Sequence, residues 1–271
     1  MHIENSHYIC ASGYPTPTAA ELKREQELQR AIKNHELFVE YQPIFRNLNG
    51  ELLGVEALVR WNHPERGTVM PADFIPTAEA SGLIVPIGEF VLEQACAQLR
   101  SWRSAQTCHL TVAVNVSAAQ LAHGDFVRVL KECVDDYGID PCRLELEITE
   151  SMPFHERSVV VKRLHELKHL GLRIVLDDFG CGYMSLSRLT TLPADGLKID
   201  RTFTRALPDN LKTMAVVRSV IELANRLGLF VVVEGVETEC QVRWLRTFGD
   251  IGIQGFRYAR PGTAEQARMS A

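Results

Sequence analysis

The sequence predicts one α/β domain built as a modified TIM (β/α)8 barrel with an antiparallel first strand. Apolar strand segments alternate with amphipathic helices through most of the chain, at the spacing of a parallel β/α array. Eight strand segments are found, the number that closes such a barrel. The first two are separated only by a short loop containing the Asn49-Gly50 turn, so they are expected to run antiparallel.

The first elements differ from the regular repeat that follows them. Residues 1–18 mix Ser, Thr, Pro and His without a period, which predicts a tail or linker before a domain over residues 19–271. Thr18 with Glu21 predicts a capping box that begins a helix over residues 19–34. The two antiparallel strands are expected over residues 37–44 and 51–59. Residues 71–74 and 81–84 are expected to form a capped connecting helix and a loop near the mouth of the barrel.

The remaining elements alternate in a regular way. Helices are expected over residues 87–102, 125–137, 157–170, 211–227 and 237–248, with a short helical segment over 183–189. Strands are expected over residues 110–116, 144–149, 172–178, 196–200, 229–233 and 251–255.

Composition and charge exclude several functional classes. The 271 residues are 46% hydrophobic, enough for one sizeable core. A net charge of −5 gives no basic footprint, which argues against binding of a nucleic-acid polymer. The seven cysteines are scattered without a Cys-x-x-Cys pair, as expected for reduced thiols in a cytoplasmic protein. No apolar run approaches the roughly 20 residues of a membrane span.

The strand over residues 172–178 ends in two adjacent carboxylates, Asp177 and Asp178, followed by Phe179 and Gly180. At a strand end one carboxylate can point into the barrel while its neighbour turns over the rim. Two unpaired carboxylates this close repel each other unless a cation lies between them. By itself the stretch also fits an ordinary strand followed by a turn.

The same pattern of an apolar strand ending in polar residues recurs along the chain, and this favours a functional site over a simple turn. The carboxyl ends of the barrel strands meet at one mouth, and buried charges are costly unless paired or metal-bound. The oxygen ligands indicate Mg²⁺ or Mn²⁺, and the surplus of carboxylates indicates two ions, an arrangement typical of phosphate-ester hydrolysis. The strand-end residues are Glu56, Asn115, Glu147, Asp177, Asp178, Lys198, Glu234 and Gln254.

Seven short motifs, in order from about residue 42 to 261, resemble the EAL domain family of cyclic di-GMP phosphodiesterases. They are Glu56-Ala57-Leu58-Val59-Arg60-Trp61, Asn115-Val116-Ser117, Glu147-Ile148-Thr149-Glu150, Asp177-Asp178-Phe179-Gly180, Lys198-Ile199-Asp200, Glu234-Gly235-Val236-Glu237 and Gln254-Gly255-Phe256. Each tripeptide alone is a weak signal, but seven in order across one domain are a strong one.

The resemblance implies hydrolysis of cyclic di-GMP to linear pGpG with two Mg²⁺ or Mn²⁺ ions, and a homodimer. A sensor or GGDEF-type domain preceding it in a longer parent protein is a further expectation. The metal ligands implied are Glu56, Asn115, Glu147, Asp177 and Asp178; the catalytic residues are Glu234, Lys198 and Asp178; the substrate-binding residues are Gln42, Leu58, Arg60, Asp200, Gln254 and Phe256; and Glu150 and Glu237 support a loop and the dimer.

The chain departs from the family pattern at a few positions. Cys181 and Met184 stand where most members have Thr and Ser, so regulation through this loop is more in doubt than metal ligation. The usual Cys-Asp pair before Gln254 is absent, and Arg257 follows Phe256 where an apolar residue is common.

Four alternatives remain beside this interpretation. An unrelated metal-dependent barrel lyase or isomerase would not explain the order of the motifs. A catalytically inactive EAL domain would act as a cyclic di-GMP receptor or interaction module, although the complete ligand set favours the enzyme. His165 and His169 match His-Glu-x-x-His, but they flank the buried face of their helix and no third zinc ligand follows. Lys198 could form a Schiff base, but nearby carboxylates would keep it charged.

Overall fold

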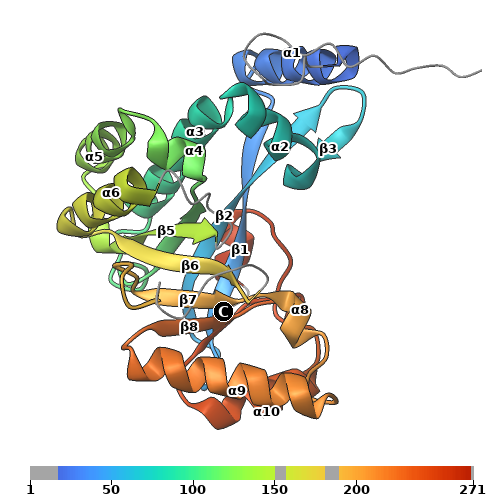
Figure 1. Ribbon diagram of the computed structural model, residues 1–271, viewed down its shortest axis with the longest axis vertical. Helices are drawn as coiled ribbons and strands as arrows, with labels where there is room; N and C mark the ends of the chain where they lie inside the picture. The colour runs from blue at the N-terminus through green and yellow to red at the C-terminus, as the bar shows by residue number, and fades with distance from the viewer. Residues whose placement is uncertain (1–17, 150–156, 181–188, 270–271) are drawn as a thin grey trace, which may run out of the picture.

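The computed structural model describes residues 18–149, 157–180 and 189–269. Its described strands form one sheet in the order β1-β9-β8-β7-β6-β5-β4-β2-β3, and β1 also pairs with β2 (Figure 1). That last pairing closes eight strands into a barrel, while β3 lies outside it as the partner of β2. The strands are β1 Leu37–Arg46, β2 Leu52–His63, β3 Gly67–Val69, β4 Thr111–Asn115, β5 Leu144–Thr149, β6 Arg173–Phe179, β7 Gly196–Ile199, β8 Phe230–Val233 and β9 Gly252–Ile253.

The strand directions confirm the predicted fold class. β1 runs antiparallel to both of its neighbours, β2 and β9, whereas the other barrel pairs are parallel. The carboxyl ends of seven strands therefore meet at one mouth of the barrel.

Some strand bounds were wrong in detail, and one strand was not predicted. β2 continues to His63 instead of ending at Val59, and β3 was missed because three residues carry no readable hydrophobic period. The last strand, expected over residues 251–255, contains only Gly252–Ile253.

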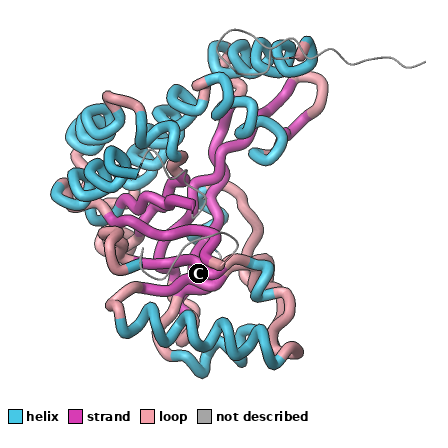
Figure 2. Tube along the Cα trace, in the orientation of Figure 1, coloured by secondary structure: helices cyan, strands magenta, loops and turns pink. Residues whose placement is uncertain are grey.

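Helices surround the barrel on its outer side (Figures 1 and 2). They are α1 Ala19–Lys33, α2 Pro71–Ser81, α3 Ile84–Ser101, α4 Ala118–Ala122, α5 Phe126–Tyr137, α6 Arg157–His169, α8 Arg201–Thr204, α9 Leu211–Arg226, α10 Glu239–Leu245 and α11 Ala264–Met269, with 3₁₀ turns at Pro141–Arg143 and Arg246–Phe248. The predicted capping box of α1 is present, since Glu21 N donates to Thr18 Oγ1 at 3.3 Å and Thr18 N donates to Glu21 at 2.7 Å.

Two of the predicted helices differ from the expected ranges by more than one residue at an end. α3 begins at Ile84, three residues before the expected start. The helix expected over residues 237–248 is α10 followed by a 3₁₀ turn. Residues 1–17, the short helix expected over 183–189 apart from its last residue, and Glu150, Cys181 and Met184 lie outside the described part of the chain.

The buried apolar residues form two clusters. The larger one fills the barrel and the space between the strands and the helices. The smaller one lies beneath α1 and α2 and includes Leu28, Trp61 and Phe74. Figure 1 shows α1, α2 and β3 at one end of the molecule, where β1 and β2 extend beyond the other strands. Among the described helices, none is both long and apolar enough to cross a membrane.

Candidate active site

Lys198 lies at the centre of the polar residues in the barrel mouth. Its side chain is 1% exposed, and its Nζ lies 2.9 Å from Glu56 Oε2, 3.0 Å from Glu147 Oε1 and 2.6 Å from Glu234 Oε1. Asp177 Oδ1 is farther away, at 3.8 Å. The strand-end residues that the sequence predicts to meet therefore do so, with one ammonium among four carboxylates.

Glu56 is also held by two side-chain amides. Asn115 Nδ2 donates to Glu56 Oε1 at 2.8 Å, and Gln254 Nε2 donates to Glu56 Oε2 at 2.8 Å. Gln254 Nε2 also lies 3.2 Å from Gln42 Oε1, and Gln42 is paired in register with Glu56 across β1 and β2. Burial acts to raise the pKa of Glu56, but Lys198 and the amide donors lower it to about 2.

The other site carboxyls have raised pKa values. Burial is the largest cause at each of them, and neighbouring carboxylates add to it. The pKa of Glu147 lies well above its usual value, and that of Glu234 is raised to about 7 although Lys198 opposes the shift. Burial acts to lower the pKa of Lys198, but the surrounding carboxylates raise it well above the usual value. The site thus holds a permanent cation and carboxyls that bind protons readily.

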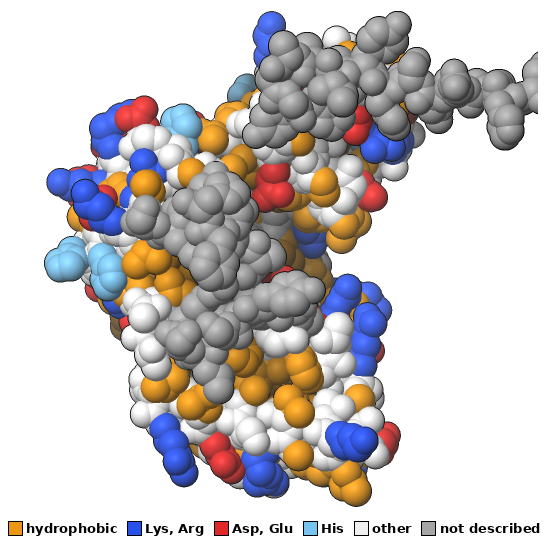
Figure 3. All heavy atoms as spheres, in the orientation of Figure 1, with side chains coloured by type: hydrophobic (Ala, Val, Ile, Leu, Met, Phe, Trp, Pro, Cys, Tyr) orange, Lys and Arg blue, Asp and Glu red, His pale blue; other side chains and the backbone are white. Residues whose placement is uncertain are grey.

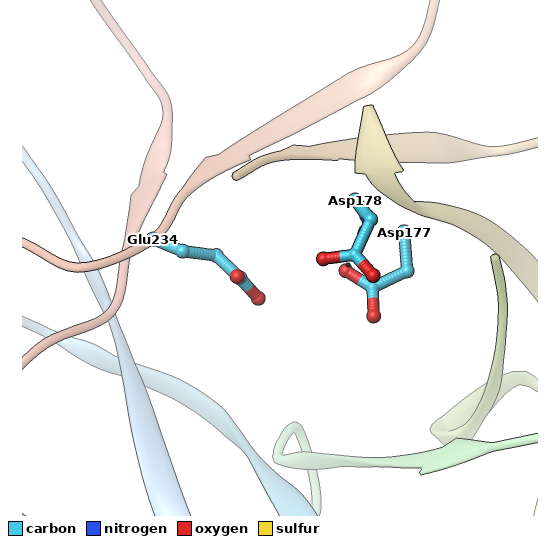
Figure 4. A group of neighbouring side chains, drawn as sticks. All are labelled: Asp177, Asp178 and Glu234. Atoms are coloured by element: carbon cyan, nitrogen blue, oxygen red, sulfur yellow. Dashed lines mark hydrogen bonds between the residues drawn. The ribbon is translucent and has the colours of Figure 1, made fainter. Parts of the chain in front are cut away.

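An irregularity in β6 brings both adjacent aspartates to the same side. The pairing of β6 with β7 shifts register between Leu176 and Phe179, and Asp178 has a φ of 55°. Side chains in a regular strand alternate between faces, and a bulge interrupts that alternation. Asp178 N donates to Asp177 Oδ1 at 2.8 Å. Figure 4 shows the two carboxylates side by side, facing Glu234 across the site.

This arrangement fits divalent cations with oxygen ligands. One oxygen from each of Asp177, Asp178 and Glu234 can be chosen so that the three lie within 4.8 Å of one another. In addition, Glu147 Oε2 and Gln254 Oε1 are buried and have no hydrogen-bond partner among the described residues, and such atoms are rare unless something else satisfies them. Carboxylate and amide oxygens are the ligands that Mg²⁺ and Mn²⁺ prefer.

The residues predicted to bind substrate differ from one another in burial and in the groups that they contact. Arg60 lies two residues from Leu58 and four from Glu56, on the same face of β2. It is 4% exposed, and its Nε donates to Glu40 Oε2 at 2.8 Å. The sequence interpretation missed Glu40, although alternation along β1 places it on the same face as Gln42.

Asp200 and Phe256 are also predicted to bind substrate, and each makes a different kind of contact. Asp200 caps α8, since its Oδ1 accepts from Thr202 N at 2.8 Å. Phe256 is 49% exposed, and the guanidinium carbon of Arg260 lies 4.3 Å from its ring centroid. Glu237 is exposed at the start of the turn into α10, where its backbone N–H donates to Gln241 Oε1 at 2.8 Å.

The histidine pair on α6 does not form a metal site with described residues. His165 and His169 are exposed, and His169 Nδ1 lies 2.6 Å from the backbone oxygen of His165. Val160, Leu164 and Leu167 form the buried face of the helix, as predicted. The described part of the chain contains one acidic group able to hold an ion, and it lies in the barrel mouth.

Figure 3 shows a notch in the surface between the end that carries α1 and α2 and the rest of the molecule. Lys and Arg side chains gather on one lip of this notch, in the region of α8. A positively charged lip favours the approach of an anionic ligand, because local potentials act even where the net charge of the chain is negative.

Comparison with known proteins gives consistent results. A family model described as the EAL domain matches residues 25–261. The bifunctional diguanylate cyclase/cyclic di-GMP phosphodiesterase MucR of Pseudomonas aeruginosa is 41% identical over 266 residues, which cover 98% of this chain and 39% of MucR. The cyclic di-GMP phosphodiesterase PdeR of Escherichia coli is 38% identical over 237 residues, 88% of this chain and 36% of PdeR. The chain thus spans well under half the length of either relative.

The fold is also shared with a solved structure. The PaMucR phosphodiesterase in its c-di-GMP complex matches with a TM-score of 0.85 and 40% identity, covering 90% of this chain and 99% of that one. The family match takes in the predicted metal ligands, Lys198, Glu234 and Gln254. The chain therefore belongs to the EAL domain family.

Proposed function

We propose that this chain hydrolyses cyclic di-GMP to linear pGpG with two divalent cations, Mg²⁺ or Mn²⁺. The observation that carries the proposal is the convergence of Asp177, Asp178 and Glu234 oxygens within 4.8 Å, beside the buried ammonium of Lys198. The names of MucR and PdeR and the c-di-GMP complex of PaMucR support the choice of substrate.

The proposal assigns each metal ligand to one or both of the two ions. Glu56, Asn115, Glu147 and Asp177 would hold one ion, and Asp177 with Asp178 would hold the second. Because Asn115 Nδ2 donates to Glu56, its amide oxygen remains as the atom for an ion. When bound, the ions would withdraw charge from the phosphoryl oxygens and lower the pKa of the attacking water.

The chain's own groups move and hold the protons. Glu234, with a pKa of about 7, is matched to accept a proton from the attacking water near neutral pH. Lys198 lies 2.6 Å from Glu234 and orients it, and its charge also favours the approach of the scissile phosphate. The water oxygen forms a bond to phosphorus, the bond from phosphorus to the 3′ oxygen breaks, and that oxygen takes a proton to become a hydroxyl. The phosphate stays on the 5′ oxygen, as in pGpG.

Two features of the whole protein belong to the proposal as well. The length of the relatives supports a parent protein with further domains, such as a sensor or GGDEF-type domain before this one. We also place the active form as a homodimer in the cytoplasm, where the substrate acts as a second messenger. Light scattering of the purified chain at several concentrations tests the dimer.

The test of the activity is a direct turnover assay. Protein dialysed against EDTA should not convert cyclic di-GMP to pGpG, and added Mg²⁺ or Mn²⁺ should restore conversion. Ca²⁺, which is larger and accepts looser geometry, should support binding with little turnover. Full activity in EDTA would refute the dependence on cations. Tight binding of cyclic di-GMP without pGpG release under either metal would assign the chain to the receptor class.

A further inference from the structure

Glu40 and Arg60 form an ion pair on the face of β1 and β2 that carries the active site. The register of these antiparallel strands places Glu40 opposite Leu58 and diagonally next to Arg60. Opposite residues of an antiparallel pair lie on one face of the sheet, and long side chains reach the diagonal neighbour. On the same face, two residues along β1, Gln42 lies opposite Glu56. The ion pair is therefore continuous with the site around Glu56.

The guanidinium of Arg60 is held by two of its nitrogens. Its Nε donates to Glu40 Oε2 at 2.8 Å, and its Nη1 donates to the backbone oxygen of Val59 at 3.0 Å. A guanidinium is planar, so two contacts from different nitrogens fix both its position and its orientation. The described part of the chain offers Nη2 no hydrogen-bond partner, and the two N–H groups of this nitrogen remain for a ligand.

Arg60 lies at a distance from the ion-binding carboxylates. It follows Glu56 by four residues on β2, so its Cα is roughly 13 Å further along the strand. The pairing of β2 with β4 ends at Ala57 and Val114, and Arg60 belongs to the part of β2 that extends beyond the other strands (Figure 1). A long side chain bridges part of that distance. Arg60 is thus suited to an anionic group of the ligand other than the one at the ions.

We propose that Glu40 is a positioning residue, which holds the guanidinium of Arg60 in the orientation that binds the non-scissile phosphodiester of cyclic di-GMP. The identity of this ligand rests on the proposed function. Guanidinium binds phosphate through parallel N–H···O bonds that depend on the orientation of its plane. A guanidinium that rotates freely keeps its charge but pays more entropy on binding. Glu40 removes that cost before the ligand arrives.

The carboxylate of Glu40 also repels a phosphate, and burial decides which effect is larger. The side chain of Glu40 is 30% exposed and that of Arg60 is 4% exposed. Solvent screens the charge of Glu40 toward a ligand in the open mouth, whereas its hydrogen bond to the buried guanidinium is screened much less. The net effect of Glu40 is therefore to strengthen binding.

The test is a double-mutant cycle on cyclic di-GMP binding, measured by calorimetry in Ca²⁺ with wild type, Glu40→Ala, Arg60→Ala and the double variant. Loss of a hydrogen-bonded charge predicts an affinity about 10- to 100-fold weaker for Arg60→Ala. Glu40→Ala should weaken binding about tenfold, and the double variant should match Arg60→Ala, because Glu40 acts through Arg60. Glu40→Gln keeps an acceptor oxygen and should retain most of the affinity. It also replaces Glu40→Ala in the cycle if that variant does not fold, with Glu40→Asp as the variant whose carboxylate is withdrawn by one methylene.

Turnover in Mg²⁺ gives a second measurement. The phosphodiester at Arg60 is remote from the scissile bond and is bound equally in the ground and transition states, so Glu40→Ala should raise KM and leave kcat within a few-fold. Glu36→Ala is the matched control. Glu36 accepts from Trp61 Nε1 at 2.9 Å across the same pair of strands, and its loss should change neither KM nor affinity.

Three results would overturn the positioning role. They are an unchanged or tighter affinity in Glu40→Ala, an equal loss when Glu40 is removed from the Arg60→Ala variant, and a fall in kcat without a rise in KM. Failure of the proposed function gives a different result. A wild type that binds cyclic di-GMP in Ca²⁺ but releases no pGpG in Mg²⁺ or Mn²⁺ refutes hydrolysis, while the binding cycle still decides the role of Glu40. A wild type that does not bind the ligand refutes both.

Discussion

Replacing Lys198 with methionine tests whether the site is held together by its own cation. Met has a similar length but no charge, so Lys198→Met leaves Glu56 and Glu147 buried without the ammonium that lies 2.9 and 3.0 Å from them. All three side chains are at most 8% exposed, so solvent screens the loss very little. Removal of one partner from a buried ion pair costs roughly 3 to 5 kcal/mol, which corresponds to a fall in melting temperature of about 10 °C for a domain of this size.

The loss should depend on pH in a defined direction. Without Lys198 the carboxyls are kept mainly in the protonated form, and an acid with a raised pKa in the folded chain destabilises the fold as pH increases. This destabilisation begins near pH 4.5, the usual pKa of a glutamic acid, and grows until the pH reaches the raised pKa of Glu147 in the folded chain. The variant should therefore be closer to wild type at pH 5 than at pH 8, and divalent cations should restore more stability to it than to wild type, because they replace the missing charge.

The assay is urea and thermal unfolding in EDTA at both pH values, with and without Mg²⁺. Lys212→Met serves as the control, because Lys212 is exposed at the start of α9 and its substitution removes the same charge from the surface. A Lys198→Met protein as stable as Lys212→Met at pH 8 in EDTA would show that the ammonium does not compensate the buried carboxylates.

Three other predictions concern protons and ligands. Glu234→Gln keeps the shape of the side chain but removes its basicity, so pGpG release measured by chromatography should fall roughly 10²- to 10⁴-fold while cyclic di-GMP affinity measured by calorimetry changes little; a wild-type rate would remove Glu234 from this role. Because the pKa of Glu234 is about 7, binding of Mn²⁺ at pH 7 should release about half a proton or more per chain. Calorimetry would show this release as a binding heat that varies with the ionisation enthalpy of the buffer. Equal heats in all buffers would contradict the raised pKa. The double change His165→Ala and His169→Ala should leave hydrolysis within a few-fold of wild type and bound zinc unchanged, and loss of both together would restore the zinc-site interpretation.

The barrel could be predicted from the sequence because its strands are short apolar runs that each end in a polar residue. The strand ends determine which side chains meet, so the sequence alone predicts that Glu56, Glu147 and Lys198 lie together. What could not be predicted was how these groups satisfy one another. That Lys198 contacts the carboxylates directly, at the centre of the group, depends on distances across the barrel that periodicity does not encode.

The same limit explains the elements that were missed or misplaced. β3 depends on pairing with the far end of β2 and has no pattern of its own. Glu40 was overlooked because nothing in the sequence indicates that it pairs with Arg60, twenty residues later, once β1 and β2 are in register. In both cases the information lies in the pairing of two strands and not in either strand alone.

The left-handed backbone at Asp178 also affects how this domain can change over time. A non-glycine residue with a φ of 55° is uncommon and costs on the order of 1 kcal/mol, and glycine would avoid that cost. Selection for stability of the fold alone would therefore favour replacement of Asp178, whereas selection for a carboxylate beside Asp177 retains it. A population of such domains released from the need to bind an ion should lose the residue at 178 early, while the buried positions of β6 that precede it, such as Leu176, are preserved by packing.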